Sequence, residues 1–262
     1  MDQDRPQHPP LSVSVVIACR NSASTLGLQL EALAGQTYEG CWEVIVSDNG
    51  STDALLKVVD EFRDRLPGLR VIDSSGRLGA GCARNAAAET AKYEYLAFCD
   101  ADDEVTPTWL AALAEALQEN DFVAGRFEPS KLNARRSRTL QQDSQLQTSP
   151  FGPGLPHAGA GNMGIRRSVF LAVGGFDQSL RTLEDTDLCW RVQLAGHRLV
   201  FAPRAIVHVR LRSGVIAMWR QGAPTAGPPL DWSGGTGQVS HGMRPRSGAT
   251  SQVGRHRFLL RR

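Results

Sequence analysis

Residues 95–103 read Tyr95-Leu96-Ala97-Phe98-Cys99-Asp100-Ala101-Asp102-Asp103, a short apolar run that passes directly into carboxylates. An apolar run of this length between polar residues is typical of a buried β-strand. Two carboxylates with one residue between them, on a turn after such a strand, can converge on one hard cation. Mg²⁺ and Mn²⁺ prefer carboxylate and water oxygens, and substrate phosphates fill their remaining positions. The stretch therefore predicts a strand whose end binds Mg²⁺ or Mn²⁺.

Two strand-like runs earlier in the chain also end in polar side chains. Asn21 follows the run Val13–Ile17, and Asp48 follows the run Trp42–Val46. Asp and Asn after a strand also form turns and cap helices, so each of them has a purely structural explanation. In open α/β sheets, however, ligands bind beyond the carboxyl ends of the strands. Three polar strand ends together favour a binding site at one edge of the sheet.

Helical patterns separate these runs, and the alternation indicates βαβ units around a mostly parallel sheet. Leu26, Leu30 and Leu33 share one helical face after the first run, and Gly79–Gly81 opens an alanine-rich helix. Pro107 stands at the expected first position of the helix after the carboxylates. The pattern predicts an α/β domain of the Rossmann-like kind.

The periodic pattern fails in two regions. Residues 128–161 are rich in Ser, Gln, Arg, Pro and Gly, and loops of this length are usually functional or disordered. Beyond this region, short strands are predicted at 200–201 and 206–209. After Trp219 no periodicity remains.

The length of 262 residues permits one large domain or two small ones, and an apolar fraction of 41% supports a real core. We predict one domain over 11–210 with halves at 11–127 and 128–210. A disordered segment at 1–10 and an irregular tail at 211–262 are expected to flank it.

No segment has the pattern of a signal peptide or of a membrane span. The first residues are polar, and the apolar run from Val13 to Ala18 is too short to cross a bilayer. The five cysteines are an odd number without a CxxC pair. They lie in or beside predicted strands and helices, so we expect reduced core thiols in a cytoplasmic protein.

The C-terminal end is strongly basic. From Arg210 onward the chain has nine arginines, no lysine and a single acidic residue, Asp231. A basic tail on an acidic body suggests peripheral contact with an anionic surface, such as the inner face of a membrane. Because neither amphipathic periodicity nor interleaved aromatic residues accompany the charge, a solvated irregular tail is the alternative, and no nucleic-acid partner is expected.

Taken together, six motifs resemble those of the family 2 glycosyltransferases, which are inverting enzymes of the GT-A fold. They follow the family's order and spacing from about residue 12 to 210. In this chain they are Val15–Asn21, Glu43–Asp53, Gly79–Asn85, Asp100–Asp103, Gly174–Asp177, and Glu184–Leu188 with Arg191. The chain departs from the family at Ala18-Cys19-Arg20, where a proline and a tyrosine are usual.

The resemblance implies a single GT-A-type domain with hexosyltransferase-like activity in glycan biosynthesis at the cell envelope. The donor would be a nucleotide-diphosphate sugar, and the acceptor a hydroxyl group of a saccharide, a lipid-linked molecule or another compound. Transfer would invert the anomeric configuration with the help of Mg²⁺ or Mn²⁺. The half at 11–127 would bind the nucleotide sugar, and the half at 128–210 the acceptor.

The resemblance also implies roles for individual residues. The donor would be bound by Asp48 at the base, Asn21 at the ribose or phosphate, Arg84 near the base or diphosphate, and Asp100 with Ala101 at the ribose. Asp102 would ligate the metal, with His208 completing the metal shell, and Asp185 would be the general base for the acceptor hydroxyl. The acceptor side would include Asn162, Gly175 and Glu184.

Three of these assignments have structural alternatives. Thr182-Leu183-Glu184-Asp185 fits a capping box, which is compatible with catalysis because a helix start would hold the carboxylate in place. His208 is equally explained as a strand residue with a satisfied hydrogen bond, although neutral imidazole is a common metal ligand. Arg84 could be a solvated helix residue, but it stands near a helix N-terminus suited to anions.

Two other functions compete with the transferase. A nucleotidyltransferase should have a glycine-rich, basic phosphate loop after the first strand, and residues 18–22 do not form one. A non-catalytic nucleotide-sugar-binding protein of the same fold is the second competitor. The presence of Asp100, Asp102 and Asp185 argues against it, and the irregular tail argues for it.

Overall fold

The computed structural model describes residues 9–133, 145–149 and 152–211. They belong to the first of two compact units, Met1–Thr225, and the second unit, Ala226–Arg262, lies outside the described residues. The described strands are β1 (Val13–Cys19), β2 (Trp42–Asp48), β3 (Arg70–Asp73), β4 (Tyr95–Asp100), β5 (Glu104–Val105), β6 (Phe122–Glu128), β7 (Gln147–Thr148), β8 (Pro156–His157), β9 (Asn162–Arg166) and β10 (Leu199–His208). The described helices are α1 (Ala23–Ala34), α2 (Leu55–Asp60), α3 (Ala80–Thr90), α4 (Trp109–Glu119), α5 (Arg167–Ala172) and α6 (Glu184–Leu194).

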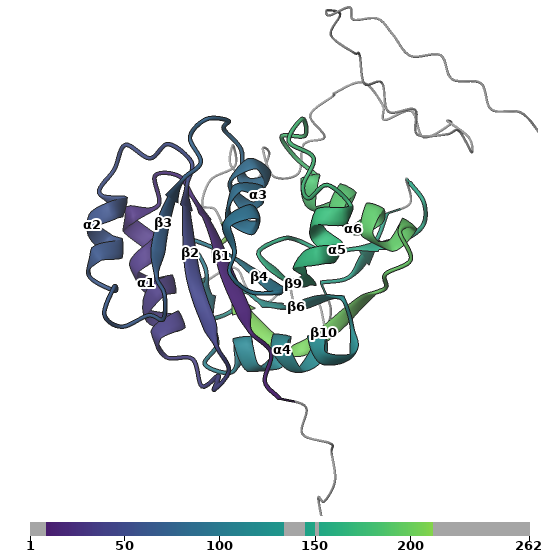
Figure 1. Ribbon diagram of the computed structural model, residues 1–262, viewed down its shortest axis with the longest axis horizontal. Coiled ribbons are helices and arrows are strands. Elements are labelled where there is room, and N and C mark those ends of the chain that lie inside the picture. Colours follow the sequence, from purple (N-terminus) through teal and green to yellow (C-terminus); the bar gives the residue numbers. More distant parts are fainter. Residues whose placement is uncertain (1–8, 134–144, 150–151, 212–262) are drawn as a thin grey trace, which may run out of the picture. The chain divides into compact units, whose positions relative to one another are not determined.

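Eight of the described strands form one sheet, in the order β3-β2-β1-β4-β9-β6-β10-β5, and β7 pairs with β8 separately (Figure 1). β1 runs parallel to both β2 and β4, β2 to β3, and β6 to β10. β9 is antiparallel to its neighbours β4 and β6, and β5 is antiparallel to β10. The prediction of an α/β domain with a mostly parallel central sheet is therefore confirmed.

The register of β1 brings the predicted polar strand ends to one edge of the sheet. Cys19 at the end of β1 pairs with Asp48 of β2, and Ala18 pairs with Asp100 of β4. Because the three strands are parallel, the loops that follow them leave from the same edge. That edge is where ligands bind in open α/β sheets.

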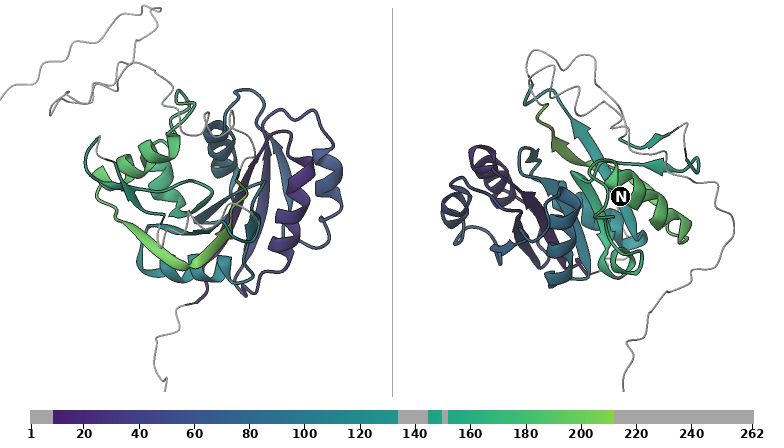
Figure 2. Two further views of the ribbon diagram at one scale, coloured as in Figure 1. Left: turned by 180° about the vertical axis from the view of Figure 1, so that it is seen from behind. Right: turned by 90° about the horizontal axis from the view of Figure 1, so that it is seen from above.

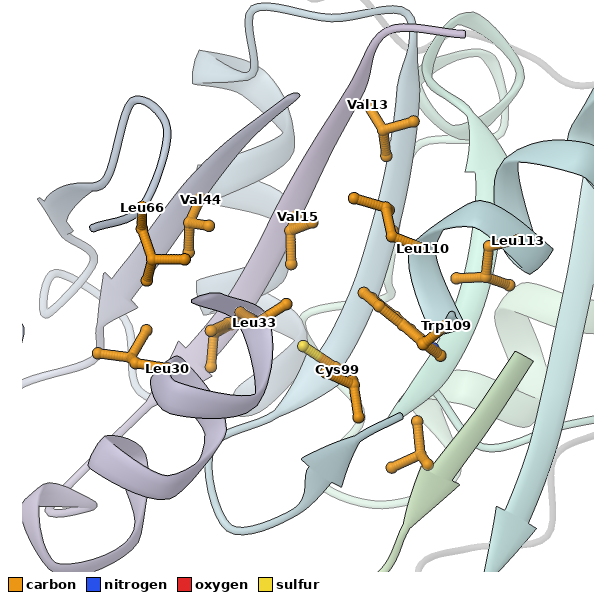
Figure 3. Close-up of a cluster of buried hydrophobic side chains, with 14 of the residues drawn as sticks. Val13, Val15, Leu30, Leu33, Val44, Leu66, Cys99, Trp109, Leu110 and Leu113 are labelled. Carbon is orange, nitrogen blue, oxygen red and sulfur yellow. The ribbon is translucent and has the colours of Figure 1, made fainter. Parts of the chain in front are cut away.

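Alternating side chains along the strands produce two apolar layers, one on each face of the sheet. On one face α1, α2 and α4 pack through residues such as Leu30 and Trp109 (Figure 3). On the other face α3, α5 and α6 pack through residues such as Phe170 and Leu188. Figures 1 and 2 show α1 and α2 on one side of β1, β2 and β3, and α3 on the other. Each such side chain contributes about 1.5–3 kcal/mol when buried, so both layers stabilise the sheet that carries the polar edge.

Two predicted elements differ from those observed. The short strands expected at 200–201 and 206–209 are one strand, β10, whose register against β6 shifts between Ala202 and Ile206. A bulge of this kind accommodates the proline at position 203 without ending the strand. Helix α4 begins at Trp109 after Thr108 in the cap position, so Pro107 precedes the helix instead of starting it.

The cysteines differ from the prediction at one position. Cys19, Cys82, Cys99 and Cys189 are free and buried, as expected, but Cys41 is exposed because it lies in the loop just before β2. Among the described residues, no helix combines the length and the apolar character needed to cross a membrane.

Candidate active site

A pocket of about 560 Å³ opens at the carboxyl ends of β1 and β4. Its wall is formed by the β1–α1 loop, the start of α3 and the turn after β4, together with Arg210. Of the residues predicted to bind the donor, Asn21, Arg84, Asp100 and Ala101 line this pocket, as does the predicted metal ligand Asp102.

A second pocket of about 430 Å³ lies between α4 and the bulge of β10. Its lining includes Glu115, Asn120, Phe201 and Arg204, and it contains none of the predicted site residues. Arg204 is already paired with Glu115 there. The carboxylates therefore mark the first pocket as the candidate site.

Two carboxylates, Asp100 and Asp102, line this pocket, and the buried Asp103 lies next to them. Asp100, Asp102 and Asp103 each offer an oxygen, and these atoms lie within 4.8 Å of one another. A compact set of carboxylate oxygens suits Mg²⁺ or Mn²⁺, so the residues present fit the predicted metal. Asp103 was not predicted as a site residue, and its place directly after the DxD pair was the only sequence signal for it.

Asp103 is buried beneath the other two carboxylates. Burial, aided by the negative charge of Asp100, raises the pKa of Asp103 to about 8. The backbone N–H of Arg210 donates to Asp103 Oδ1 at 2.8 Å and partly opposes this shift. Near neutral pH Asp103 is therefore protonated in the metal-free protein.

We expect the replacement Asp103→Asn to stabilise the metal-free protein increasingly as the pH rises from about 5 to about 8. The folded chain keeps the Asp103 proton up to about pH 8, whereas the unfolded chain loses it near 3.8. Between these values the folded state binds more protons, so the stability of the native chain falls with pH, by at most about 1.4 kcal/mol per pH unit. Above the folded pKa the difference should level off.

This difference can be measured by denaturant unfolding of both chains with a chelator at several pH values. Asp64→Asn, at an exposed carboxylate, is the matched control. A stability difference between Asp103→Asn and the native chain that stays constant with pH would show that Asp103 titrates normally.

Arg84 connects the carboxylate floor to α6. It lies buried in α3, and its Nη2 is 2.8 Å from Asp100 Oδ1 while its Nη1 is 3.6 Å from Glu184 Oε1. Its guanidinium also lies 5.4 Å from the ring centre of Phe176. Burial lowers the pKa of Arg84, but the two carboxylates more than offset this and raise it. Arg84 is therefore a fixed cation in the pocket wall, not a solvated helix residue.

Helix α6 begins in an unusual backbone conformation. Leu183 occupies the cap position with a φ of +64°, and it makes no side-chain cap hydrogen bond, so the predicted capping box is wrong. The leucine side chain cannot accept a hydrogen bond, although the Leu183 carbonyl accepts the N–H of Asp187 at 2.9 Å, and Asp185 Oδ1 accepts the N–H of Thr186 at 2.7 Å. Burial raises the pKa of the neighbouring Glu184 above its usual value.

Asp185 and Asp100 approach the same short segment, the turn that precedes β9. A Cβ atom at Gly161 would lie only 2.6 Å from Asp100 Oδ2, and one at Gly159 would lie 3.8 Å from Asp185 Oδ2. The two carboxylates therefore come to this segment from different elements, β4 and α6, and Gly161 allows the close approach of Asp100.

Asn21 links the β1–α1 loop to the β2–α2 loop, and Asp48 makes a local contact within the β2–α2 loop. Asn21 has a φ of +51°, its Oδ1 accepts the N–H of Thr52 at 2.8 Å, and its own N–H donates to Ser51 Oγ at 3.0 Å. Asp48 Oδ1 accepts the N–H of Ser51 at 2.8 Å. Both side chains therefore hold the β1–α1 and β2–α2 loops in place beside the pocket. Their predicted contacts with the nucleotide stay predictions.

Asn49 follows Asp48 at the predicted polar end of β2, and it lines the pocket although no role was predicted for it. Its Oδ1 accepts the N–H of Gly79 at 2.7 Å, and its Nδ2 donates to the carbonyl of Ser74 at 2.6 Å. These bonds fix the start of α3, whose residues Gly79 and Ala80 line the same pocket, and a helix N-terminus there suits an anion.

His208 lies on β10 outside the carboxylate cluster. Its Nδ1 is 2.7 Å from Glu128 Oε2. Burial raises the pKa of Glu128, but hydrogen bonds from Ser130 and His208 outweigh this and lower it to about 2. His208 is therefore next to a carboxylate, and its role as a metal ligand stays a prediction.

Two residues predicted for the acceptor side have mainly structural contacts. Asn162 is completely buried, and its side chain bonds to Trp109 Nε1 and to the carbonyls of Arg126 and Ala205 at 2.9–3.0 Å. Gly175 has a φ of +64° in a turn whose carbonyl accepts a bond from Arg191. Their contact with an acceptor stays a prediction. Glu184, the third residue predicted for the acceptor side, contacts the pocket residue Arg84.

The model of a known family, Glycosyl transferase family 2, matches residues 14–174. The chain belongs to this family. It is 30% identical over 206 residues to the pre-mycofactocin glycosyltransferase of Mycobacterium tuberculosis, a match that covers 74% of this chain and 42% of the relative. It is also 29% identical over 196 residues to the glycosyltransferase AglE of Haloferax volcanii, covering 72% and 64%. The chain thus spans less than two thirds of either relative.

Two solved structures have a similar fold. One is the mannosyltransferase PcManGT of Pyrobaculum calidifontis in complex with GDP-Man and Mn²⁺, with a TM-score of 0.65 and 21% identity over 82% of this chain and 61% of that one. The other is S. aureus TarS 1-349 in complex with UDP-GlcNAc, with a TM-score of 0.62 and 23% identity over 79% and 61%. The predicted GT-A fold is confirmed.

Proposed function

We propose that this chain transfers a sugar from a nucleotide-diphosphate donor to a hydroxyl acceptor with inversion of the anomeric centre. The observation that carries the proposal is the meeting of Asp100 and Asp185 at the Gly159–Gly161 segment, with Arg84 linking Asp100 to the start of α6. A donor-side carboxylate and the candidate base therefore approach the same short segment from different elements. PcManGT with GDP-Man and TarS with UDP-GlcNAc support a nucleotide sugar as the donor.

The donor would occupy the pocket at the carboxyl ends of β1 and β4. Asp102, with Asp100 and Asp103 beside it, would hold Mg²⁺ or Mn²⁺. A divalent cation there supplies neutralisation of the diphosphate as its bond to the sugar breaks. Arg84 keeps Asp100 in one orientation through the 2.8 Å ion pair, and the N–H groups at the start of α3 contribute a further positive potential.

Asp185 is the residue we assign as the general base. Its carboxylate would take the proton of the acceptor hydroxyl as the acceptor oxygen forms a bond to the anomeric carbon. The nucleoside diphosphate leaves from the opposite face with the electron pair of the broken bond, so the product has the inverted configuration. The hydrogen bond from the Thr186 N–H and the fixed start of α6 orient the Asp185 carboxylate for this step.

Calorimetric titration with UDP, GDP and dTDP, with and without Mn²⁺, tests the donor site directly. We expect the native chain to bind one of the three in a metal-dependent way, because the carboxylate oxygens of Asp102 and its neighbours would otherwise repel the diphosphate. The replacement Asp102→Ala should remove this binding, whereas Asp64→Ala at an exposed carboxylate should not.

Failure of the folded native chain to bind any of these nucleotides would contradict the proposal. Where binding is found, the radiolabelled sugar donor of that nucleotide, mixed with saccharide and lipid-linked acceptors, distinguishes transfer from mere binding. The arginine-rich residues after Leu211 lie outside the described residues. Membrane contact through them and the nature of the acceptor stay predictions.

A further inference from the structure

Arg210 lies beyond the residues matched to the family, two positions after the end of β10. Its backbone N–H donates to Asp103 Oδ1 at 2.8 Å, and its Nε donates to the carbonyl of Asp102 at 3.0 Å. Arg210 is also one of the residues that line the candidate donor pocket. Two separate hydrogen bonds therefore hold this arginine against the carboxylate turn.

The segment around Arg210 is anchored on its other side as well. Asn133 donates to the carbonyl of Val209 at 2.7 Å and accepts the N–H of Leu211 at 2.9 Å. The N–H of Val209 donates to the carbonyl of Glu128 at 3.0 Å. These bonds hold the backbone on both sides of Arg210, and the Nε bond to the carbonyl of Asp102 holds its side chain before any ligand arrives.

The positive charge of Arg210 is only weakly matched by protein carboxylates. Its Nη2 is 3.8 Å from Glu104 Oε1, but Glu104 is also paired with Lys131 Nζ at 2.6 Å. Asp103 accepts only the backbone N–H of Arg210. An arginine guanidinium stays protonated in proteins, so this side chain presents a permanent cation to the pocket.

Arg84, the other buried cation of the pocket, differs in this respect. Its two terminal nitrogens face Asp100 and Glu184. Arg210 donates from Nε to the carbonyl of Asp102, and its Nη2 has only the more distant contact with Glu104 at 3.8 Å. The planar fork of terminal N–H groups in an arginine matches the oxygens of a phosphate group in geometry and charge.

We propose that Arg210 binds the diphosphate of the nucleotide donor, and this assignment rests on the proposed function. Its terminal N–H groups would donate to non-bridging phosphate oxygens next to the carboxylate cluster. They would also stabilise the charge of the nucleoside diphosphate as it leaves. Arg210 is thus a specificity residue that distinguishes a diphosphate from the bare nucleoside.

The test compares the dissociation constants of the nucleoside diphosphate and of the matching nucleoside for Arg210→Gln, in the full chain with Mn²⁺. We expect the diphosphate to bind roughly tenfold to 100-fold more weakly, and the nucleoside to stay within about twofold of the native value. Arg210→Lys, which keeps the charge but loses the fork, should lie between. The control is Lys131→Gln. It removes another positive charge that pairs with Glu104, and Lys131 does not line the pocket.

Equal losses for nucleoside and diphosphate in Arg210→Gln would overturn the assignment, because they would mean that Arg210 only supports the turn. Unchanged diphosphate affinity in Arg210→Gln, with normal binding by the native chain, would overturn it as well and leave the proposed function intact. Absence of diphosphate binding by the native chain would overturn both.

Discussion

Asp185→Asn is expected to lower the turnover number for sugar transfer about 10²–10⁴-fold. Asparagine keeps the shape of the side chain and can still accept the N–H of Thr186, which lies 2.7 Å from Asp185 Oδ1. It cannot take a proton from the acceptor hydroxyl. Since Asp185 is assigned to the acceptor side, the affinity for the nucleoside diphosphate should change by no more than about twofold.

The measurement is the steady-state rate of transfer together with calorimetric binding of the nucleotide. Asp187→Asn is the matched control, because it also removes one negative charge from the first turn of α6. The side chain that it changes is paired with Arg191 and is not the assigned base. Retention of near-native transfer by Asp185→Asn would exclude Asp185 as the base. Parallel loss of transfer and of nucleotide binding would point to a disturbed start of α6 instead.

Arg84→Met is expected to lower the free energy of unfolding by about 1–3 kcal/mol, less than for a fully buried ion pair because the Asp100 side chain is 37% exposed. Asp100 would lose its 2.8 Å partner, and the half-buried Glu184 would lose the cation 3.6 Å away. Methionine fills most of the volume against Phe176, so packing alone should not produce the loss. Arg84→Lys, which restores a charge without the fork, should recover part of it.

Denaturant unfolding measures this effect, and Arg65→Met supplies the comparison. Arg65 pairs with Glu31 at the surface, where solvent screens the interaction, and its loss should cost little. A similarly small effect for Arg84→Met would mean that the Arg84 contacts do not stabilise the folded chain. Recovery of stability as the pH is lowered and Glu184, whose pKa is raised, takes up a proton would trace part of the loss to that carboxylate.

The fold and the edge of the sheet where the donor pocket lies could be predicted, because the sequence patterns that indicate them are local. β1, β2 and β4 are short apolar runs, and each ends at a polar residue, so parallel pairing alone gathers Asp48 and Asp100 at one edge. The observed strand β10 could not be predicted as a whole, because its passage through Pro203 depends on a register shift against β6.

Other features of the site depend on contacts between distant segments. The protonation of Asp103 results from burial by its surroundings, and the contact from Arg84 to Glu184 joins α3 to α6. The capping-box pattern misled because the backbone turns left-handed at Leu183, which local sequence does not favour for leucine. Side-chain partners of this kind follow from the tertiary structure and not from spacing.

The distribution of thiols makes the chain suitable for labelling at a single site. Four cysteines are buried, and burial raises the pKa of Cys189 to about 12, so these thiols resist alkylation by a maleimide dye. Cys41 is exposed, and it precedes β2 at the amino end of the strand, whereas the pocket opens at the carboxyl end of the neighbouring β1. A fluorophore attached there would leave the nucleotide pocket open, and no engineered cysteine would be needed.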